Sequence, residues 1–512
     1  MKIALFSISS DIRTIGLLNV SSFLRTNNIK HSFVYFLLPI GTQVVPDEMT
    51  SALNTYLEEN KFDLIGITVG TIYFNVARQM TESIRKCLPG AFVIWGGMHP
   101  TVAPDESLQY SDAICIGEGE EPFLEFIQGF ERKDFYNINN IYVNTESGIK
   151  KNELRHLVEN LDTRPYPKVD WQKTSIWISG YDKVFPLSKD IFEKYSPRRG
   201  SMYDIMASRG CPFSCTYCCN SVFKRIYRGK GKLLRFRSVD HLIAELKYAI
   251  DNFPAVRIFN FEDDAFGSAP EPYLKEFSEK YVANINKPFH IRILPTMINE
   301  SKLALLKKAG LISAVMGLQA SDRVNRTIYK RPTTRESFLS TARLLRKYEI
   351  AGRYDVIIDN PYEDENDLRE VIQTFEEAPK PYKLDIFSLA FLPFTELSMK
   401  AIADGTYTPE SSGYVDAMSA RVNHMFPDLV KILEMTPYTP KMVIDRLLAI
   451  KNEKARNTIL EIYYNIIFRI EKIALKIIMK NSNRILLAKR FVYSTLNITQ
   501  KLKNMLGQRT SD

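Results

Sequence analysis

The sequence predicts an α/β protein with a doubly wound, Rossmann-like N-terminal domain, then a partial (β/α)6 barrel, then a helical C-terminal region. Two observations lead to this prediction. Short apolar runs alternate with helical patterns across residues 1–135 and again across 201–400, as in parallel sheets covered by helices. From residue 401 to 512 the patterns are helical only. A chain of 512 residues has room for two to four domains.

The first alternating region contains the apolar runs KIALFSI, DLIGITV, FVIWGG and AICIGEGE, and each ends in glycine or small polar residues. Helical patterns such as FNVARQMTESIRKCL lie between them. This order predicts a doubly wound sheet, in which ligands bind at the carboxyl ends of the strands. Residues 136–200 are expected to form a linker with a hairpin, because NNIYVNTESGIKKN resembles two short strands and ENLDTRPYPKVDW is rich in proline and aspartate.

The second alternating region, 201–400, repeats a strand–helix unit six times. The predicted strands are YDIMAS, VRIFNFED, HIRILPT, SAVMGLQ, RYDVIID and LDIFSLAF. Six units predict an open, partial form of the eight-unit α/β barrel, and chemistry in that architecture belongs at the carboxyl ends of the strands.

The net charge of +9 is concentrated at the C-terminus. Residues 451–512 contain 13 Lys and Arg against 4 Asp and Glu, so the first 450 residues are neutral overall. Apolar residues recur at helical spacing from Tyr463 to Ile478, with Arg469, Lys472 and Lys476 on the opposite face. This pattern fits a helix on the protein's own core, a partner helix, or peripheral contact with an anionic membrane. The segregated charge argues against nucleic acid.

The chain is expected in the cytoplasm, with the inner face of the membrane as a further place for the basic tail. No apolar run is long enough to span a bilayer, and the N-terminus lacks the pattern of a secretory signal. Six cysteines provide no disulfide framework, which fits a reducing compartment.

Four of the six cysteines lie within nine residues, in the loop after the first predicted barrel strand. Cys211, Cys215 and Cys218 form a CxxxCxxC pattern that could ligate three irons of a [4Fe–4S] cluster, leaving the fourth iron open. A four-cysteine zinc site that includes Cys219 is the alternative, although adjacent cysteines seldom chelate one metal. Four structural thiols remain a third interpretation.

The CxxxCxxC pattern, with Tyr217 before its third cysteine, resembles the signature of the radical S-adenosylmethionine (SAM) superfamily. The segments FNFEDDAF, MGLQASDRVNRTIYKRPT and DVIIDNPYEDENDL follow in the order found in that family. The resemblance implies that the three cysteines hold a [4Fe–4S] cluster whose free iron binds SAM. Reductive cleavage of SAM then yields a 5′-deoxyadenosyl radical. The residues that the resemblance places near SAM are Tyr217, Glu262, Asp263, Gln319, Ser321 and Arg331.

The N-terminal region resembles cobalamin-binding radical SAM proteins through IGITVGT, VIWGGMHPTVAPDE and AICIGEGEEPFLEF. Methionine-synthase-type domains carry DxHxxG after the first strand, with the histidine beneath cobalt. Here the ligand position is Arg13, which does not ligate metals, so cobalamin would bind without a protein histidine below it. The residues expected around cobalamin are Asp11, Arg13, Gly16, Thr68, Gly70, Gly96, Gly97, Gly117 and Gly119.

The resemblance implies a cobalamin-dependent radical SAM enzyme that methylates an unactivated carbon of a small-molecule or lipid substrate. An electron donor such as flavodoxin or ferredoxin would be needed. Two alternatives remain at this point: a radical SAM enzyme that performs rearrangement, cyclisation or carbon–carbon coupling, and a non-catalytic zinc-binding adaptor. The individual catalytic residues and the substrate cannot be identified from the sequence, because pocket residues in such folds carry no motif.

Overall fold

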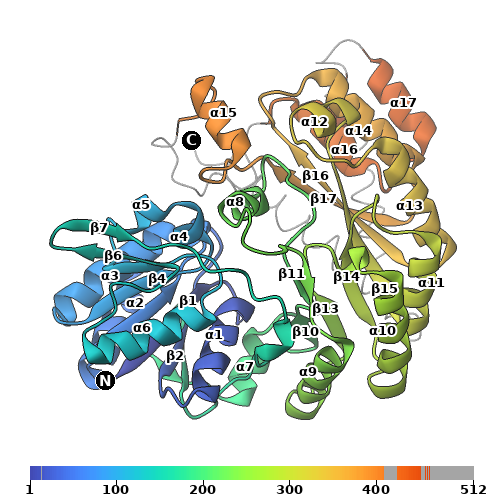
Figure 1. Ribbon diagram of the computed structural model, residues 1–512. Helices are drawn as coiled ribbons and strands as arrows, with labels where there is room; N and C mark the ends of the chain where they lie inside the picture. The colour runs from blue at the N-terminus through green and yellow to red at the C-terminus, as the bar shows by residue number, and fades with distance from the viewer. Residues whose placement is uncertain (13, 409–423, 451–455, 457, 459, 462–512) are drawn as a thin grey trace.

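The computed structural model describes all residues except 13, 409–423, 451–455, 457, 459 and 462–512 (Figure 1). Its N-terminal part is built on a nine-stranded sheet with the order β7-β6-β5-β4-β3-β1-β2-β8-β9. The strands are β1 (Ile3–Ser9), β2 (Ser32–Leu37), β3 (Leu64–Thr68), β4 (Phe92–Gly96), β5 (Ala113–Cys115), β6 (Ile141–Thr145), β7 (Gly148–Lys151), β8 (Thr174–Ile178) and β9 (Phe185–Pro186). The five central strands β1 to β5 are parallel, as predicted.

Helices cover both faces of this sheet and bury two separate cores. The helices are α1 (Ile15–Thr26), α2 (Asp47–Asn60), α3 (Phe74–Cys87), α4 (Met98–Val102), α5 (Pro104–Ser107) and α6 (Glu120–Arg132). One core contains apolar residues of α2 and α3, such as Leu53 and Met80. The other contains Leu24 of α1 and Phe126 of α6. Strands buried on both faces explain why the sequence shows continuous apolar runs here.

Residues 136–200 contribute strands to the same sheet. The β6–β7 hairpin extends it antiparallel beyond β5, with Ile141 and Val143 buried. On the opposite edge β8 pairs parallel with β2 and buries Ile176 and Trp177. The short helix α7 (Lys189–Tyr195) then leads towards the second part of the chain. The segment expected as a linker therefore also closes both edges of the N-terminal sheet.

The second part is a six-stranded, all-parallel open barrel. Its strands, in spatial order, are β10 (Met202–Ile205), β13 (Ile258–Phe261), β14 (Phe289–Ile293), β15 (Leu311–Gln319), β16 (Ala351–Ile358) and β17 (Tyr382–Ser388). The helices packed on their outer face are α9 (Val239–Asn252), α10 (Glu271–Asn284), α11 (Glu300–Ala309), α13 (Arg335–Lys347) and α14 (Glu365–Glu377). The six predicted barrel strands and the predicted fold class are confirmed.

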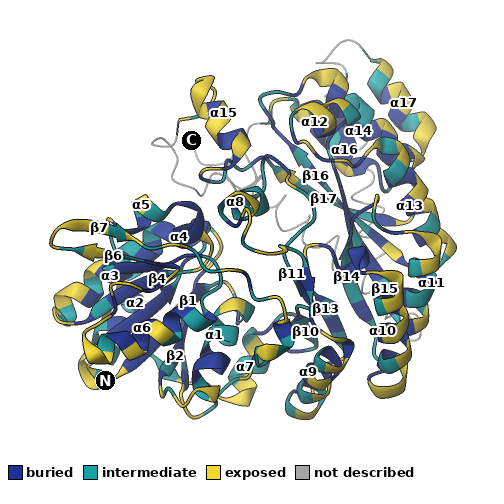
Figure 2. Ribbon diagram, viewed as in Figure 1, coloured by how far each residue is buried: buried dark blue, intermediate teal, exposed yellow. Residues whose placement is uncertain are grey.

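Shorter elements decorate the barrel, and Figure 2 shows its buried strands beneath partly exposed helices. They are the ribbon of β11 (Ser208–Arg209) and β12 (Arg235–Phe236), and the helices α8 (Cys219–Ile226), α12 (Asp322–Thr327), α15 (Glu396–Ala403), α16 (Pro427–Met435) and α17 (Lys441–Ala449). Beyond α17, Leu460 is buried in the barrel core and Arg456 pairs with Asp428 of α16. The basic amphipathic stretch 463–478 lies outside the described residues. Within the described part, no helix is long and apolar enough to cross a membrane.

Candidate functional site

The cysteine loop begins where the carboxyl ends of β10 and β13 meet. Asp263, just beyond β13, accepts hydrogen bonds from the backbone N–H of Ala207 at 3.0 Å and from the N–H and hydroxyl of Ser208. Gly210 follows with φ +88°, and a Cβ there would lie 2.3 Å from the carbonyl oxygen of Leu233. This position, directly before Cys211, therefore needs glycine.

The loop is held to the opposite side of the barrel through Thr216. Its N–H donates to the carbonyl of Tyr329 at 3.0 Å, and its hydroxyl donates to the carbonyl of Ile328 at 2.7 Å. Its own carbonyl accepts from the N–H of Leu397 at the start of α15. A loop that is anchored on both sides of the barrel presents its thiols in a defined place above the strand ends.

The three thiols that the sequence predicts as iron ligands lie in this anchored loop. Cys215 is buried, while Cys211 and Cys218 are partly exposed. Burial raises the pKa of Cys211 to about 11, and the contact with Cys219, followed by burial, raises the pKa of Cys218. The described residues contain no ready group of three His, Cys, Asp or Glu side chains around one metal ion.

The residues present fit a cluster. Three thiols lie within the eight residues from Cys211 to Cys218, and the side chain of Arg331 places a fixed positive charge beside Cys215. A cluster carrying thiolates is favoured next to such a charge. Cys219 instead packs with Val102, Ala103 and Val222, in a small apolar contact between α8 and α4 of the N-terminal domain.

Of the residues expected near SAM, Tyr217 lies in the loop, Arg331 contacts it, and Gln319 ends β15, the strand that Arg331 also contacts. The guanidinium of Arg331 is buried; its Nη1 lies 3.7 Å from Cys215 Sγ, and its Nη2 donates to the carbonyl of Gly317 at 3.1 Å. Tyr217 packs edge-on against Tyr329, with ring centroids 4.6 Å apart. Gln319, at the end of β15, has φ +73° and a buried Oε1 with no hydrogen-bond partner among the described residues. Such an oxygen is suited to a ligand's donor group.

The other three expected SAM residues make contacts within the protein. Glu262 accepts hydrogen bonds from Arg292 and Asn260 at the end of β13. Asp263 is fully buried and uses both carboxylate oxygens on Ala207 and Ser208, as described above. Ser321 caps α12, and its hydroxyl donates to Asp367 at 2.6 Å. In this structure Asp263 and Ser321 therefore position the strand ends and α12, while Glu262 remains partly exposed on the inner face.

The inner face of the barrel is polar, which the sequence analysis did not identify. On the strand face opposite the outer helices, Asn260 donates to Asp204 at 2.6 Å, and Arg353 donates to Asp385 at 2.9 Å. Asp355 of β16 lies opposite Gly317 of β15 on one side and Asp385 of β17 on the other. Burial, together with the charge of Asp385, raises the pKa of Asp355 to about 6. In the segments HIRI of β14 and RYDV of β16, every second residue is polar. This alternation is the sequence signal that could have identified the inner-face residues.

A second site is a cavity of about 320 Å³ between the N-terminal domain and the barrel. Six of the nine residues expected around cobalamin line it: Gly16, Thr68, Gly96, Gly97, Gly117 and Gly119. Asp11 and Gly70 are not part of the lining, and Arg13 lies outside the described residues. The cavity therefore brings together the carboxyl ends of β3, β4 and β5 with the start of α1.

The shape of this cavity fits an inserted cofactor group. A Cβ on Gly16 would meet no atom within 4 Å, and one on Gly96 would meet only the Cβ of Cys115 at 3.8 Å, so the absent side chains leave room. Gly97 has φ +97°, and a Cβ there would lie 2.8 Å from Thr68 Oγ1. His99 is fully buried, stacks on Phe74 and lies 3.4 Å from Glu106, which supports a structural role.

The far wall of the cavity comes from the linker and the barrel. Arg164, Tyr166, Arg237, His241 and Glu245 form much of it. The sequence analysis missed them because they lie outside any motif and reach the N-terminal domain only through the tertiary fold.

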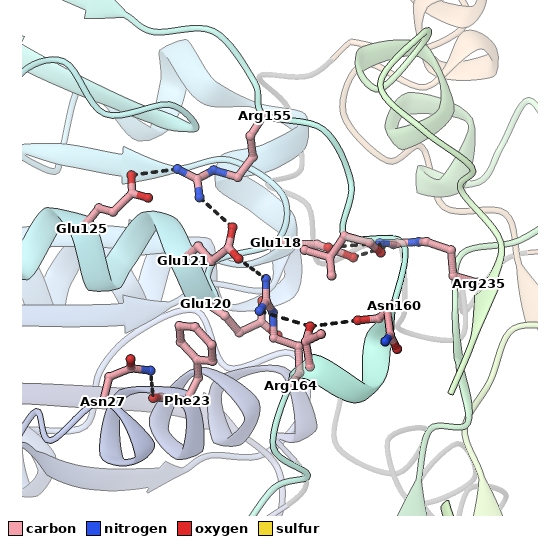
Figure 3. A network of polar contacts seen from close by, with 12 residues as sticks. Phe23, Asn27, Glu118, Glu120, Glu121, Glu125, Arg155, Asn160, Arg164 and Arg235 are labelled. Carbon is pink, nitrogen blue, oxygen red and sulfur yellow. Dashed lines mark hydrogen bonds and ion pairs between the residues drawn. The ribbon is translucent and has the colours of Figure 1, made fainter. Parts of the chain in front are cut away.

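Ion pairs hold the two walls together (Figure 3). Glu118, in the loop after β5, pairs with Arg235 of β12, and the adjacent Glu120 pairs with Arg209 of β11. Burial opposes ionisation of Glu120, but Arg209 brings its pKa below the ordinary value. Arg209 is two residues before Cys211, so these pairs connect the cavity of the N-terminal domain directly to the cysteine loop.

Three more ion pairs, made by two linker arginines, tie the linker to α6 in the same network. Arg164 donates to Glu121 at 2.5 Å, and Arg155 donates to Glu121 and Glu125, each at 2.8 Å. The wall contributed by the linker is thereby fixed to the N-terminal domain.

Two family models match the chain. The model of the radical SAM superfamily matches residues 205–375, and the model of the B12 binding domain matches residues 1–127. Together the two matches cover more than half of the 512 residues. The first match contains the cysteine loop and most of the barrel, and the second contains the glycine-lined side of the cavity.

Similar proteins include an uncharacterized methyltransferase of Pyrococcus horikoshii, 23% identical over 347 residues, or 67% of this chain and 70% of that protein. An anaerobic magnesium-protoporphyrin IX monomethyl ester cyclase of Cereibacter sphaeroides is 23% identical over 61% of this chain, which spans only 49% of that protein. Among solved structures, the radical SAM methyltransferase TsrM of Kitasatospora setae superposes with a TM-score of 0.62 at 16% identity, covering 78% of this chain and 76% of that one.

Proposed function

Because the chain belongs to the radical SAM superfamily and carries a B12 binding domain, we propose that it is a cobalamin-dependent methyltransferase of an unactivated carbon. The observation that carries the proposal is the direct connection between the glycine-lined cavity and the cysteine loop. The cofactors of this family are a [4Fe–4S] cluster, SAM and cobalamin; when bound, they supply radical formation and the methyl group. The prediction of a radical SAM enzyme is confirmed by the family match, and neither match supports a zinc-binding adaptor.

The chain's own residues provide positioning and charge. Cys211, Cys215 and Cys218 would hold the cluster, and Arg331 would keep a positive charge beside it. Gln319 would offer its buried Oε1 to SAM, while both carboxylate oxygens of Glu262 accept hydrogen bonds from Asn260 and Arg292 at the end of β13. Tyr217 and Tyr329 shield this region from water, which protects a radical from side reactions.

The polar inner face of the barrel would receive the substrate. Arg292, Arg353, Asp355 and Asp385 lie below the cysteine loop on the concave side of the sheet and are partly exposed. A substrate with polar or charged groups would form hydrogen bonds with these partly exposed side chains, whereas a purely apolar substrate would displace their water without replacing its hydrogen bonds. We therefore favour a polar small molecule over a lipid as the substrate.

A radical SAM cyclase is the second candidate, because one group of relatives consists of cyclases of a magnesium porphyrin ester. Products separate the two. A methyltransferase of this type should form S-adenosylhomocysteine together with 5′-deoxyadenosine, whereas a cyclase should form 5′-deoxyadenosine without methyl transfer.

The test is anaerobic reconstitution of the full-length protein with iron, sulfide and cobalamin, followed by reduction in the presence of SAM. We expect about four irons per chain, bound cobalamin and formation of 5′-deoxyadenosine. Transfer of an isotopic label from the methyl group of SAM to a product other than S-adenosylhomocysteine and 5′-deoxyadenosine would support methyl transfer. Failure to cleave SAM with a loaded cluster would refute the proposal.

A further inference from the structure

A strongly basic exposed surface lies beside the cysteine loop. Residues 209–239 contain eight Lys and Arg and no Asp or Glu, although the first 450 residues are neutral overall. Arg209, Arg235 and Arg237 are paired with Glu120, Glu118 and Glu245. The remaining cations are Lys224, Arg225, Arg228, Lys230 and Lys232, here called the α8 basic patch.

The α8 basic patch is exposed and poorly neutralised. Lys224, Arg225, Arg228 and Lys232 are exposed, and none of the four pairs with a carboxylate among the described residues. Lys230 has one distant partner, Glu153 at 3.7 Å, which is itself exposed. Since charges on a protein surface normally alternate in sign, four unpaired cations within nine residues produce a local positive potential.

The patch is continuous with the proposed cluster site. The ammonium group of Lys224 donates to the carbonyl of Pro212 at 3.1 Å, and Pro212 lies directly after Cys211. Helix α8 begins at Cys219, next to Cys218, and its eight residues rise only about 12 Å. Helix α8 lies between the N-terminal domain and the barrel (Figure 1). Its Val222 packs with Val102 and Ala103 beside α4, while Lys224 and Arg225 stay exposed.

Helix stability alone does not account for these cations. Basic residues in the last turn of a helix interact favourably with its free carbonyls, which would explain Lys224 and Arg225. Arg228 and Lys232 lie beyond the helix, in a turn where Gly229 and Gly231 have positive φ. They gain nothing from the helix dipole, yet they extend the same positive surface.

We propose that the α8 basic patch is the docking surface for an acidic one-electron carrier protein of the flavodoxin or ferredoxin type. The inference rests on the proposed function, because a cluster that cleaves SAM must receive one electron from outside for each cleavage. In the docked complex one electron leaves the reduced carrier and enters the cluster, and no bond is made or broken. Opposite charge on the two surfaces accelerates encounter and orients the carrier's cofactor towards the cysteine loop.

The test uses the reconstituted full-length protein and a purified acidic bacterial flavodoxin. The charge-reversal variant combines Arg225→Glu, Arg228→Glu and Lys232→Glu. The matched control combines Lys275→Glu, Lys308→Glu and Arg346→Glu, which are exposed cations on the outer helices α10, α11 and α13. Binding is measured by calorimetry, and 5′-deoxyadenosine formation is measured with reduced flavodoxin and, separately, with dithionite.

We expect the charge-reversal variant to weaken flavodoxin binding by about tenfold or more and to lower the flavodoxin-driven rate in proportion. The dithionite-driven rate and the iron content should stay at the wild-type level, and the control should behave as wild type. Raising the salt concentration from about 50 mM to about 300 mM should weaken wild-type binding more than variant binding.

Three outcomes would overturn the inference. These are unchanged flavodoxin binding in the charge-reversal variant, an equal loss of rate with both reductants, and tighter binding of a single-stranded oligonucleotide than of flavodoxin at the same patch. A wild-type protein that cleaves no SAM even with dithionite would instead refute the proposed function, so the two failures are distinguishable.

Discussion

The guanidinium Nη1 of Arg331 lies 3.7 Å from the sulfur of Cys215, although 116 residues separate the two in the sequence. The same guanidinium donates through Nη2 to the carbonyl of Gly317, on the strand that carries Gln319. Arg331 thus places a permanent positive charge between the cysteine loop and the end of β15. Because the side chain is buried, this charge is weakly screened by water.

We predict that Arg331→Gln lowers the midpoint potential of the cluster. Reduction adds a negative charge, and a nearby cation stabilises the reduced state more than the oxidised one. Loss of the cation should shift the potential by roughly 50 mV to more negative values, which corresponds to about 1.2 kcal/mol for one electron. Arg331→Lys keeps the charge and should shift it less. A redox titration followed by electron paramagnetic resonance measures both, and an unchanged potential in Arg331→Gln would contradict the assigned role.

The four cysteines should separate into three ligands and one packing residue. Replacing Cys211, Cys215 or Cys218 by Ala should abolish cluster assembly and 5′-deoxyadenosine formation. Cys219→Ala removes one small, partly buried group from the contact with Val102 and should cost about 1 kcal/mol of stability or less while retaining the cluster. Iron content and product formation are the measurements. Equal losses in Cys219→Ala and Cys215→Ala would revive the four-cysteine zinc site.

Filling the glycine-lined cavity should prevent cobalamin uptake without affecting the cluster. Gly16→Leu and Gly96→Val place side chains in the open space beside these residues. Both should reduce bound cobalamin by about tenfold, because the cofactor must then displace protein atoms. Gly90→Ala, in an exposed turn outside the cavity, is the control and should bind as wild type. Visible absorption after reconstitution measures cobalamin, and normal uptake by Gly16→Leu would show that the cofactor lies elsewhere.

The sequence predicted the elements that local patterns determine. All six barrel strands were identified, because runs such as SAVMGLQ and RYDVIID have the period and length of buried strands. Short spacings also predicted the cysteine loop after the first barrel strand and six residues that line the cavity, whose binding roles stay predictions. Even so, Asp11 and Gly70 fall outside the cavity, which shows that a matching spacing does not fix which residues face it.

Features that depend on contacts between distant segments were missed. Arg164 reaches Glu121 across 43 residues, and His241 of the barrel lines a cavity of the N-terminal domain. The sequence did not reveal that the carboxylate of Asp263 accepts hydrogen bonds from Ala207 and Ser208, and its expected place near SAM stays a prediction. The direction of a side chain at a strand end depends on which backbone donors the neighbouring strand presents, and one sequence does not reveal that pairing.

The buried carboxyl group of Glu363 should make stability depend on pH. Burial raises its pKa from 4.5 to about 8, despite a hydrogen bond from the N–H of Asn360, and the carboxylates of Asp359 and Asp367 add to the shift. The fold therefore favours the protonated acid. Its stabilising contribution is complete below about pH 4.5 and is lost as the pH rises through about 8.

We predict that Glu363→Gln is more stable than the wild type at pH 9, by on the order of 3 kcal/mol, and that the difference shrinks towards pH 6. The apparent midpoint of thermal unfolding, followed by circular dichroism across this range, is the measurement. Glu336→Gln on the exposed face of α13 is the control and should show no pH-dependent difference. A constant difference between wild type and Glu363→Gln from pH 6 to pH 9 would contradict a raised pKa.

The basic C-terminal segment should bind anionic membranes. The contacts at the end of the described chain indicate where to truncate it, because Leu460 is buried in the barrel core and Arg456 pairs with Asp428. A chain that ends at Glu461 keeps both contacts, whereas one that ends before Asn457 would lose Leu460. The removed part contains the apolar stripe from Tyr463 to Ile478 and most of the excess positive charge. Each Lys or Arg near an anionic surface contributes about 1 kcal/mol of attraction.

The full-length protein should therefore co-sediment with anionic vesicles at low salt, and the truncated protein should not. Binding should weaken as added salt shortens the Debye length below about 10 Å, and Ile470→Glu should weaken it even at low salt because the apolar face inserts less well. SAM cleavage should persist after truncation, since all proposed cofactor residues precede Glu461. Neutral vesicles are the control for charge. If the full-length protein ignores anionic vesicles, or if truncation makes the protein insoluble, the apolar stripe packs on protein and the membrane hypothesis fails.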